Sequence, residues 1–462
     1  MIQYDSRKVK PGDTFVAIPG LKYDGADFIP QAIANGAQVI VAEKEVLVPP
    51  GIKFERVPSA RKALAYLSAK YYDFPSRKLK LIGVTGTNGK TTVTHLIHSI
   101  LTTAGFKTGI IGTINSTLTT PESADLQAEL AQMVKEGITH CVMEVSSHAL
   151  AQERVYGCEF AQAIFTNLTH DHLDYHKTME GYLAAKRKLF EMLPAEAVAI
   201  INVDDPASAS LIEVVKGEVI PYGLKQAKHE LRSTKYSEFD VRVSQVEIRE
   251  KEMFLKINAT EIRTPLIGLH HAYNILAAYH SGLALGLSSS FIKKGIEAVK
   301  VIPGRQEEID LGQPFRVIVD FAHSPDSLQK LIETYRPFTK GKIILVFGCP
   351  GERDREKRPI MGEIAARFAD QVVVTTDDPH GEDPVQIIND IVKGIERSGK
   401  VFMIEIDRRK AIEEALKMAQ AGDTVLIAGR GHEKFQDFAG KKTTLDDRQV
   451  CKEVLSGGSQ KS

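Results

Sequence analysis

The stretch LKLIGVTGTNGKTT, residues 79–92, joins an apolar run to a glycine-bearing loop and then to a lysine and two threonines. The run Leu79–Val84 is typical of a buried strand, and after Lys90 apolar residues recur at helical spacing as far as Gly105. A strand, a glycine loop and a helix N-terminus bind phosphate because backbone N–H groups and the helix dipole meet the anion there. Lys90 adds a positive charge, and the hydroxyl of Thr91 is placed to bind Mg²⁺.

This loop departs from the general P-loop pattern at one position. The pattern has a glycine five residues before the Gly–Lys pair, where this chain has Val84. A glycine turn beside an exposed lysine is therefore the alternative interpretation. Because the glycines, the lysine, the threonines and the flanking elements agree with one another, we interpret the stretch as a nucleotide-binding site.

The composition is that of an ordinary globular protein. The 462 residues suffice for about three domains, and 43% are hydrophobic and 26% charged. The 59 basic and 59 acidic residues cancel, which argues against a nucleic-acid or membrane-surface partner. No apolar run approaches the roughly 20 residues of a membrane span, and the four scattered cysteines form no disulfide or zinc pattern. We expect a cytoplasmic protein, and a monomer.

The pattern of strands and helices divides the chain into three α/β units. Residues 1–78 form a small first unit. Residues 79–302 alternate strands and helices, which predicts a mostly parallel sheet around the P-loop. After a probable linker at residues 303–305, residues 303–462 alternate cleanly and predict a doubly wound, Rossmann-like sheet.

The expected elements follow from the same patterns. A helix capped by Ser59 should close the first unit, and residues 239–267 read as antiparallel hairpins. The Gly/Ser-rich tail Ser456–Ser462 is expected to be disordered. Besides the P-loop strand, strands are expected at 14–18, 38–42, 107–113, 138–145, 161–166, 315–320, 342–347, 371–375, 401–406 and 424–428.

Two polar segments follow strands of the central unit. Glu144 ends a strand beside the P-loop, where Mg²⁺ needs a second oxygen ligand next to Thr91. Without the P-loop, a glutamate at the end of a strand would be interpreted as a surface residue. The segment 166–176, TNLTHDHLDYH, crowds histidines and aspartates behind the next strand, which indicates metal or phosphate chemistry. Zinc fits poorly because no cysteine lies nearby at ligand spacing, and a histidine ligand to Mg²⁺ is an unusual alternative.

Lys186 lies on the apolar stripe of the helix that follows. On the pattern alone, a lysine that snorkels at the edge of the stripe is the favoured interpretation. A buried lysine instead loses its proton and becomes nucleophilic, and reaction with CO₂ would make it a carbamate, an oxygen ligand long enough to reach a metal. The stripe consists of Met179, Tyr182, Leu183, Phe190 and Leu193.

The third unit places polar clusters after successive strands, at the edge of the sheet where ligands bind. Any one of them could be a helix cap or a solvated turn, and Ser324 before Pro325 is good N-cap chemistry. Four at one edge favour a zwitterionic ligand, with Arg353 for a carboxylate and acidic side chains for an amine. The clusters are DFAHSPD (320–326), GCPGERDR (348–355), DDPHGED (377–383) and GRGHE (429–433).

Seven motifs in this order make the whole chain resemble the Mur ligase family. They are GTNGKTT (86–92), MEVSSH (143–148), TNLTHDHLDYH (166–176), AAKRKLF (184–190), PGRQE (303–307), DFAHSPD (320–326) and GRGHE (429–433). Within the family the chain is most similar to the MurE type, which adds the third amino acid of the peptidoglycan stem peptide. The resemblance implies one domain each for a UDP-sugar, for ATP and for the incoming amino acid.

The resemblance also implies which residues bind the substrates. Tyr4 and Ser6 match contacts to the nucleotide-sugar, although the pattern of residues 5–7 alone favours simple turn residues. The ATP site would comprise Gly86, Thr87, Asn88, Gly89, Lys90, Thr91, Thr92, Asn274, Arg305, His323 and Asp326. The muramoyl-peptide site would comprise Thr119, Thr120, Ser146, Gln152 and Arg154, and the amino-acid site Arg353, Asp377, Asp378, Pro379, His380, Gly429 and Glu433.

The implied reaction is ATP-dependent amide ligation onto UDP-MurNAc-L-Ala-D-Glu through an acyl phosphate. Thr91 and Glu144 would hold one Mg²⁺, and His172 and a carbamylated Lys186 would hold a second. The expected catalytic residues are Lys90, Glu144, His172 and Lys186. A folylpolyglutamate synthase-like ligase is an alternative, which Ser-Ser-His after Glu144 argues against. A P-loop nucleotide switch is another, which the lack of an Asn-Lys-x-Asp sequence argues against.

Two departures from the family pattern bear on the substrates. Relatives usually carry a longer stretch before the Asp-Ser-Arg segment, so we expect an abbreviated uracil pocket. Enzymes that add meso-diaminopimelate commonly have Asp-Asn-Pro-Arg where this chain has Asp-Asp-Pro-His, at 377–380. An added acid at Asp378 and a lost arginine at His380 suit a side chain that ends in an amine, so we expect lysine, modestly ahead of meso-diaminopimelate or ornithine.

Overall fold

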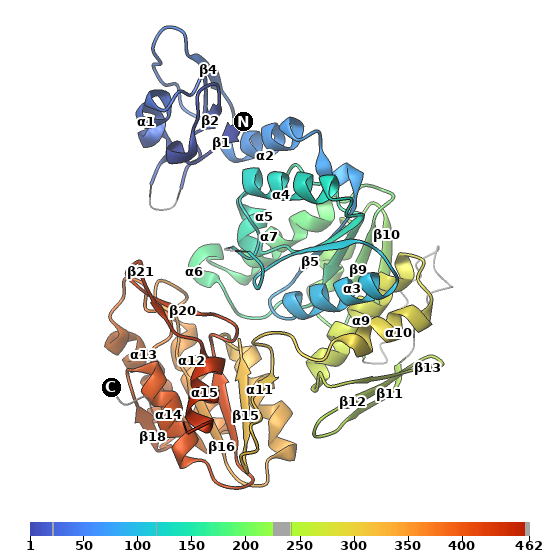
Figure 1. Ribbon diagram of the computed structural model, residues 1–462, viewed down its shortest axis with the longest axis vertical. Helices are drawn as coiled ribbons and strands as arrows, with labels where there is room; N and C mark the ends of the chain where they lie inside the picture. The colour runs from blue at the N-terminus through green and yellow to red at the C-terminus, as the bar shows by residue number, and fades with distance from the viewer. Residues whose placement is uncertain (21–22, 117, 225–240, 242, 458–462) are drawn as a thin grey trace.

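The structure is a computed structural model that describes residues 1–20, 23–116, 118–224, 241 and 243–457. Figure 1 shows three α/β domains that follow one another along the chain, which confirms the predicted fold class. Residues 239, 240 and 242 of the expected hairpins, and the tail from residue 458, lie outside the described residues. Among the described helices, none is long and apolar enough to cross a membrane.

The central domain is a parallel sheet built around the P-loop strand. The run Leu79–Val84 forms β5 (Lys80–Thr85), and its apolar side chains are buried. The strand order is β10-β9-β8-β5-β7-β6, and every pair is parallel. The carboxyl ends of the strands, and the loops that follow them, therefore share one edge. The other strands are β6 (Thr108–Ile111), β7 (His140–Glu144), β8 (Gln162–Phe165), β9 (Val198–Asn202) and β10 (Glu218–Tyr222).

Helices cover both faces of this sheet. On one face, the predicted apolar side of α3 (Lys90–Thr103) is fully buried against α9 (Leu269–Ala284) and α10 (Ser289–Ala298). The opposite face packs against α4 (Ser123–Lys135), α5 (Ser147–Ala151), α7 (Met179–Glu191) and α8 (Ser208–Ile212), and the short α6 (Leu173–His176) precedes α7. The expected hairpins form an antiparallel sheet of β11 (Val243–Ile248), β12 (Met253–Ile257) and β13 (Thr260–Thr264).

The C-terminal domain is a second wound sheet, with the order β14-β15-β19-β16-β17-β18. Only the edge strand β14 runs antiparallel, and Ser324 caps α11 as expected. The sequence patterns missed the hairpin β20–β21. The strands are β14 (Glu307–Glu308), β15 (Arg316–Asp320), β16 (Ile343–Phe347), β17 (Gln371–Val374), β18 (Phe402–Ile404), β19 (Thr424–Ala428), β20 (Phe435–Phe438) and β21 (Lys441–Thr444), and the helices are α11 (Pro325–Tyr335), α12 (Lys357–Phe368), α13 (Pro384–Glu396), α14 (Arg408–Met418) and α15 (Asp447–Leu455).

The N-terminal domain is small and stands at one end of the molecule (Figure 1). Its four strands are all parallel, and α2 packs against α4 of the central domain. Ser59 caps α2 as predicted, because its Oγ accepts from the backbone N–H of Lys62. The elements are β1 (Ile2–Gln3), β2 (Thr14–Val16), α1 (Ile29–Ala34), β3 (Val39–Ala42), β4 (Lys53–Arg56) and α2 (Ala60–Tyr71).

A buried ion pair joins the C-terminal domain to the P-loop edge of the central sheet. Lys357, at the start of α12, places Nζ 3.3 Å from Oδ1 of Asp171, and both residues are 2% exposed. Nearby, Nδ2 of Asn88 in the P-loop donates to Oδ2 of Asp326 on α11 at 2.9 Å. These contacts set the loop edges of the two sheets against each other.

Two histidine rings also lie close to Asp171 at this interface. Nε2 of His172 lies 3.6 Å from its Oδ2, and Nε2 of His323, from the C-terminal domain, lies 3.7 Å away. Burial alone would raise the pKa of Asp171, but Lys357 and the two imidazoles outweigh burial and hold this pKa below its ordinary value. Asp171 is therefore an anion at neutral pH, and Lys357 is its buried counter-ion.

We predict that Lys357→Met lowers the free energy of unfolding by about 3 kcal/mol, because it leaves the Asp171 charge buried without its cation. Urea denaturation measures this loss. Lys293→Met, which removes the half-exposed i,i+4 pair with Glu297, is the control and should cost about 0.5 kcal/mol. In the double variant Asp171→Asn/Lys357→Met the loss should be smaller than the sum of the two single losses. Equal losses for Lys357→Met and Lys293→Met would contradict the role of this pair.

Candidate active site

The P-loop connects β5 to α3 and needs both of its glycines. Gly86 and Gly89 have φ values of 150° and 89°. A Cβ at Gly86 would lie 1.9 Å from Oγ1 of Thr166, and one at Gly89 would lie 2.4 Å from Oδ1 of Asn274. Only glycine fits such close approaches, which bring the loop backbone against its neighbours and leave its concave side open. Asn274, expected at the ATP site, thus packs directly on the loop.

Two lysine side chains converge on one backbone carbonyl beneath this loop. Nζ of Lys186 donates to the Gly86 carbonyl oxygen at 2.7 Å, and Nζ of Lys90 donates to the same oxygen at 3.0 Å. Lys186 is 1% exposed, so it is buried rather than snorkelling, and its Nζ lies 4.3 Å from the centroid of the Tyr182 ring. Burial, and then the charge of Lys90, lower the pKa of Lys186 well below its usual value.

Thr91 and Glu144 meet at the carboxyl end of β7. Oγ1 of Thr91 donates to Oε1 of Glu144 at 3.0 Å, and the backbone N–H of Thr113 donates to the same oxygen at 2.9 Å. The guanidinium of Arg305 donates to Oγ1 of Thr91 at 3.0 Å and stacks over the Phe321 ring. Two oxygen donors, one of them a carboxylate, lie side by side at the start of α3, a combination that suits Mg²⁺.

His172 occupies the loop after β8, next to the same pocket. Its backbone is left-handed, with φ of 58°, and its ring centroid lies 5.9 Å from that of Tyr182. Burial lowers the pKa of His172 to about 2, against the opposing attraction of Asp171. The imidazole is therefore neutral at physiological pH, the form that donates a lone pair to a metal.

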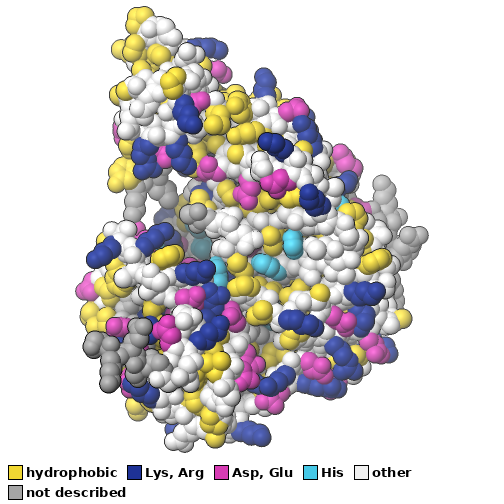
Figure 2. Space-filling model, in the orientation of Figure 1, with side chains coloured by type: hydrophobic (Ala, Val, Ile, Leu, Met, Phe, Trp, Pro, Cys, Tyr) yellow, Lys and Arg dark blue, Asp and Glu magenta, His cyan; other side chains and the backbone are white. Residues whose placement is uncertain are grey.

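A cleft of about 770 Å³ opens between the central and C-terminal domains, and it gathers most of the predicted site. Figure 2 shows the molecule hollowed on the side where the N-terminal and C-terminal domains face each other. The predicted residues that line the cleft are Thr87, Asn88, Gly89, Lys90, Thr91, Thr92, Thr119, Thr120, Glu144, Ser146, Arg154, His172, Arg305, His323, Arg353, Asp377, Asp378, His380, Gly429 and Glu433.

Other predicted residues support the cleft from behind or lie away from it. Gly86, Lys186 and Asn274 sit beneath the P-loop, and Asp326 accepts from Asn88. Pro379 packs its carbonyl against Gly351. These residues contribute through the backbone or through neighbours rather than by facing the cleft.

Tyr4 and Ser6 lie in the N-terminal domain, outside this cleft. The hydroxyl of Tyr4 donates to Oδ2 of Asp125 at 2.5 Å, which links the first domain to α4. Ser6 is buried in a 3₁₀ turn capped by Asp5, and its Oγ donates to Oε1 of Gln31 at 2.6 Å. The structure therefore gives both residues structural partners.

The residues expected to hold the muramoyl-peptide form one connected group. Oγ1 of Thr120 donates to the Glu144 carbonyl oxygen at 2.8 Å. Arg154 reaches the Thr120 carbonyl at 2.9 Å and Oε1 of Gln152 at 2.8 Å. Ser146 caps α5 and receives a hydrogen bond from Thr120, while Thr119 shares one with Thr113. This polar wall continues from the Glu144 site towards the N-terminal domain.

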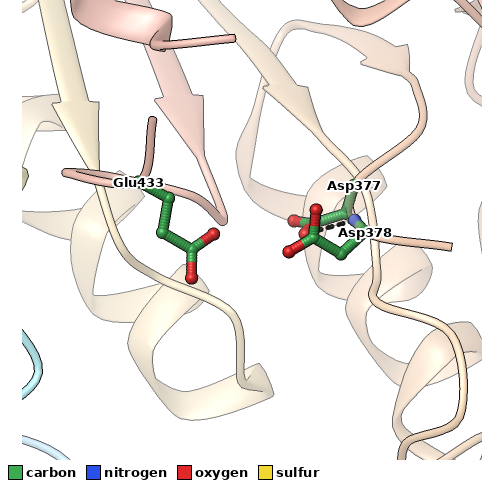
Figure 3. A group of neighbouring side chains, drawn as sticks. All are labelled: Asp377, Asp378 and Glu433. Carbon is green, nitrogen blue, oxygen red and sulfur yellow. Dashed lines mark hydrogen bonds between the residues drawn. The ribbon is translucent and has the colours of Figure 1, made fainter. Parts of the chain in front are cut away.

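Three carboxylates face each other at the far end of the cleft (Figure 3). One ligand oxygen from each of Asp377, Asp378 and Glu433 lies within 4.8 Å of the others. Oδ2 of Asp377 is buried without a hydrogen-bond partner, so it is free to accept one. Burial, and then the charge of Asp377, raise the pKa of Glu433 to about 8.

Asp378, the added acid of the sequence, lines the cleft but has a cationic partner inside the protein. Arg430, which is fully buried, places Nη1 2.5 Å from Oδ1 of Asp378, and the backbone N–H of Asp437 donates to the same oxygen at 2.9 Å. The charge of Asp378 is therefore balanced inside the protein. An extra negative charge for a substrate amine, on which the preference for lysine rested, does not result from this residue.

His380 and Arg353 line the same cleft as these carboxylates. His380 has a left-handed backbone, with φ of 49°, and its Nδ1 lies 3.8 Å from Oδ2 of Asp437. Arg353 is exposed at the rim of the cleft, where one Nη donates to the Glu352 carbonyl oxygen. Arg353 is thus well placed to meet a ligand carboxylate from solvent.

The sequence interpretation missed three buried charges of this site, namely Asp171, Lys357 and Arg430. Asp171 was one of several acids in a crowded segment, and nothing local distinguished it. Lys357 and Arg430 stand in ordinary helical and loop contexts, and their partners lie 186 and 52 residues away in the chain. The neighbouring Gly429, which was predicted, packs against the carboxylates, because a Cβ there would lie 2.5 Å from Oδ2 of Asp377.

Known protein families and relatives match this chain along almost its whole length. Sequence profiles described as "Mur ligase family, catalytic domain", "Mur ligase middle domain" and "Mur ligase, glutamate ligase domain" match residues 1–78, 84–282 and 304–431. A curated relative from Syntrophomonas wolfei, named UDP-N-acetylmuramoyl-L-alanyl-D-glutamate--2,6-diaminopimelate ligase, is 43% identical over 99% of this chain and 94% of its own length. Seven further relatives, 40–44% identical, bear the same name.

Solved structures extend the similarity to the fold. One of an enzyme with that same name has a TM-score of 0.65 at 30% identity and covers 99% of this chain and 94% of its own. MurF ligase from Thermotoga maritima, solved in complex with ADP, has a TM-score of 0.67 at 18% identity, covers 99% and 97%, and shows the fold alone. The chain therefore belongs to the Mur ligase family of ATP-dependent, ADP-forming ligases.

Proposed function

We propose that this chain is the cytoplasmic ligase that joins the third amino acid to UDP-MurNAc-L-Ala-D-Glu, with cleavage of ATP to ADP and phosphate. The observation that carries the proposal is the single cleft that connects the P-loop of the central domain to the carboxylates of the C-terminal domain. A phosphate-binding loop at one end and an amine-binding group at the other are what a ligase of an acid and an amino acid requires. The names of the relatives, 40–44% identical, support the same reaction.

The two proposed Mg²⁺ sites follow from the donor groups. Thr91 and Glu144 offer adjacent oxygens for one ion, and neutral His172 with a carbamylated Lys186 would complete the other. Bound Mg²⁺ would neutralise charge on the phosphates during transfer. Lys90 and the backbone N–H groups of residues 87–92 would bind the phosphates, and Arg305 and His323 flank them from the C-terminal side.

In the proposed reaction the D-glutamyl carboxylate oxygen attacks the γ-phosphorus of ATP. A new P–O bond forms as the bond to the β-phosphate oxygen breaks, so that ADP leaves and an acyl phosphate remains. The neutral amine of the amino acid then attacks the acyl carbon, the C–O bond to phosphate breaks, and the amine proton passes to water or phosphate. The protein supplies position and positive charge.

We propose that a carbamate on Lys186 removes the repulsion between the ammonium groups of Lys186 and Lys90. Two ammonium groups that share the Gly86 carbonyl oxygen repel each other, and the buried Lys186 amine is the more readily deprotonated. A neutral amine attacks the carbon of CO₂, forms an N–C bond and loses one proton to water, which leaves a carbamate anion. The product replaces repulsion of Lys90 by attraction and adds two oxygens for a metal.

We propose 2,6-diaminopimelate as the amino acid that is added, with lysine as the second candidate. The names of the relatives favour diaminopimelate, and the pairing of Asp378 with Arg430 removes the charge argument for lysine. The guanidinium of Arg353 and the imidazole of His380 line the cleft and offer hydrogen-bond donors for a second carboxylate. The free Asp377 oxygen and Glu433 suit an amine, which both amino acids have, so lysine stays the competitor.

The decisive assay measures ADP release with UDP-MurNAc-L-Ala-D-Glu, ATP, Mg²⁺ and one amino acid. We expect release to require both the nucleotide-sugar and the amino acid, and kcat/KM to be at least about tenfold higher for meso-diaminopimelate than for lysine or ornithine. Release that is unchanged when either substrate is omitted would instead indicate a nucleotide switch. A higher kcat/KM for lysine would transfer the assignment to lysine.

We predict that Lys186→Ala lowers kcat by about a hundredfold or more, because the carbamate oxygens are lost from the metal site. Acetate, a short carboxylate that fits the space left by the side chain, should restore part of the activity. Lys188→Ala is the matched control on the same helix, since Lys188 is half exposed and pairs with Glu153 at 2.8 Å. Its kcat should stay within twofold of the wild-type value, and full activity of Lys186→Ala would exclude the carbamate role.

Glu433 should make binding of the amino acid pH-dependent. Its pKa is raised to about 8, so the carboxyl is neutral below this pH and becomes an anion above it. An anion attracts the substrate ammonium, so KM for the amino acid should fall roughly fivefold to tenfold between pH 7 and 8.5. Glu433→Gln should abolish that fall. A KM that is flat with pH in the wild-type enzyme would rule out this titration.

A further inference from the structure

Arg430 contacts the amino-acid pocket without lining it. Its guanidinium is 0% exposed, and Nη1 lies 2.5 Å from Oδ1 of Asp378, whereas Asp377 and Glu433 are farther away, at 3.6 Å and 3.5 Å. A second donor, Nη2, reaches the carbonyl oxygen of Phe435 at the start of β20. Arg430 therefore makes its close contacts with Asp378 and the hairpin and leaves the other two carboxylates at longer range.

The loop of residues 376–380 is fastened to the hairpin β20–β21 along its length. Nε2 of the buried Gln436 donates to the carbonyl oxygens of Thr376 and Asp377, and the N–H of Asp437 donates to Oδ1 of Asp378. The N–H of His380 donates to the carbonyl oxygen of Asp437 at 3.0 Å. Asp378 is thus the one side chain of the described loop that joins Arg430 and the hairpin backbone at a single oxygen.

Asp377 is left in the opposite state. Its Oδ1 accepts from the backbone N–H of Asp378, but its Oδ2 is buried and has no hydrogen-bond partner. Figure 3 shows the carboxyl group of Glu433 extending towards the two aspartates from the facing loop. A buried, unsatisfied carboxylate oxygen is costly unless a donor reaches it, and an ammonium group entering the cleft would supply that donor.

We propose that Arg430 is a positioning residue for amino-acid selection, which neutralises Asp378 and ties it to the hairpin so that only Asp377 and Glu433 receive the substrate amine. This inference rests on the proposed function of the cleft. It makes Asp378 part of the scaffold, although the residue stands in the row of acids that faces the cleft. It also accounts for a pocket with three carboxylates that does not carry three free negative charges.

The inference predicts that removal of Asp378 harms the pocket through Arg430. In Asp378→Asn the freed guanidinium lies within 3.6 Å of both remaining carboxylates and turns to them. KM for the amino acid should rise tenfold or more, while KM for ATP and kcat stay within about threefold. Removal of the arginine as well, in Asp378→Asn/Arg430→Met, should free Asp377 and Glu433 and return KM to within about threefold of the wild-type value.

The double variant is the decisive arm of the experiment. If Asp378 bound the substrate directly, loss of Arg430 would not repair its loss, and a double variant no better than Asp378→Asn overturns the proposal. An Asp378→Asn enzyme with unchanged KM overturns it as well. Arg409→Met is the matched control in the same domain, since Arg409 is half exposed and pairs with Glu453 on the surface. Its KM values should equal those of the wild type.

A second measurement needs no substrate and separates this proposal from the proposed function. The melting temperatures of the wild type, Asp378→Asn, Arg430→Met and Asp378→Asn/Arg430→Met form a double-mutant cycle. The fall in the double variant should be smaller than the sum of the two single falls, because each single change leaves one charged group of the pair without its partner. Additive falls contradict the coupling even if the chain proves inactive. Failure of the wild type to ligate any amino acid contradicts the proposed function alone.

Discussion

Two lysine amines at one carbonyl oxygen set the central constraint of this protein. Lys186 and Lys90 both donate to the Gly86 oxygen, at 2.7 Å and 3.0 Å, and Lys186 is buried whereas Lys90 also lines the cleft. Two charges so close are unfavourable in a low dielectric, so the site favours anything that brings negative charge. A triphosphate above the loop and a carbamate beneath it are the two anions that we propose for this site. We therefore interpret the P-loop as a positively charged site that is neutralised when anionic ligands bind.

The rest of the fold brings the polar side chains of other loops to this positively charged site. Both large sheets are almost wholly parallel, so their loops gather at one edge of each, and the ion pair between Asp171 and Lys357 sets these edges against each other. One cleft then spans the carboxylate of Glu144 and the carboxylate pocket of Glu433. Electrostatic contacts therefore align the two half-sites, and a continuous apolar core that contains residues of both domains also packs them together.

The sequence patterns predicted those features that depend on residues close together in the chain. The P-loop strand and α3 follow from an apolar run, a glycine pair that no other residue could replace, and helical spacing. The Ser59 and Ser324 caps were found for the same reason. The burial of Lys186 was visible as a cation on an apolar stripe, although pattern alone favoured a snorkelling side chain. Resemblance to a family, rather than spacing, supplied its metal role, which stays a prediction.

Charges that meet across the chain were beyond reach of the sequence. Asp378 looked like an added acid because a sequence shows its charge but not the buried Arg430 that balances it, 52 residues later. Asp171 and Lys357, in different domains, were missed in the same way. The short hairpin β20–β21 lacks a strong alternating pattern and is stabilised by its contacts with the loop of residues 376–380. In each case the determining partner is distant in sequence.

The claim that Lys186 and Lys90 together favour anions at this site is tested most directly by ¹³C NMR. The protein would be measured in ¹³C-bicarbonate with Mg²⁺ and a non-hydrolysable ATP analogue. The account predicts one carbamate carbon signal at neutral pH that is present in the wild type and absent from Lys186→Met. No carbamate signal at saturating bicarbonate, or a signal that persists without Lys186, would contradict it.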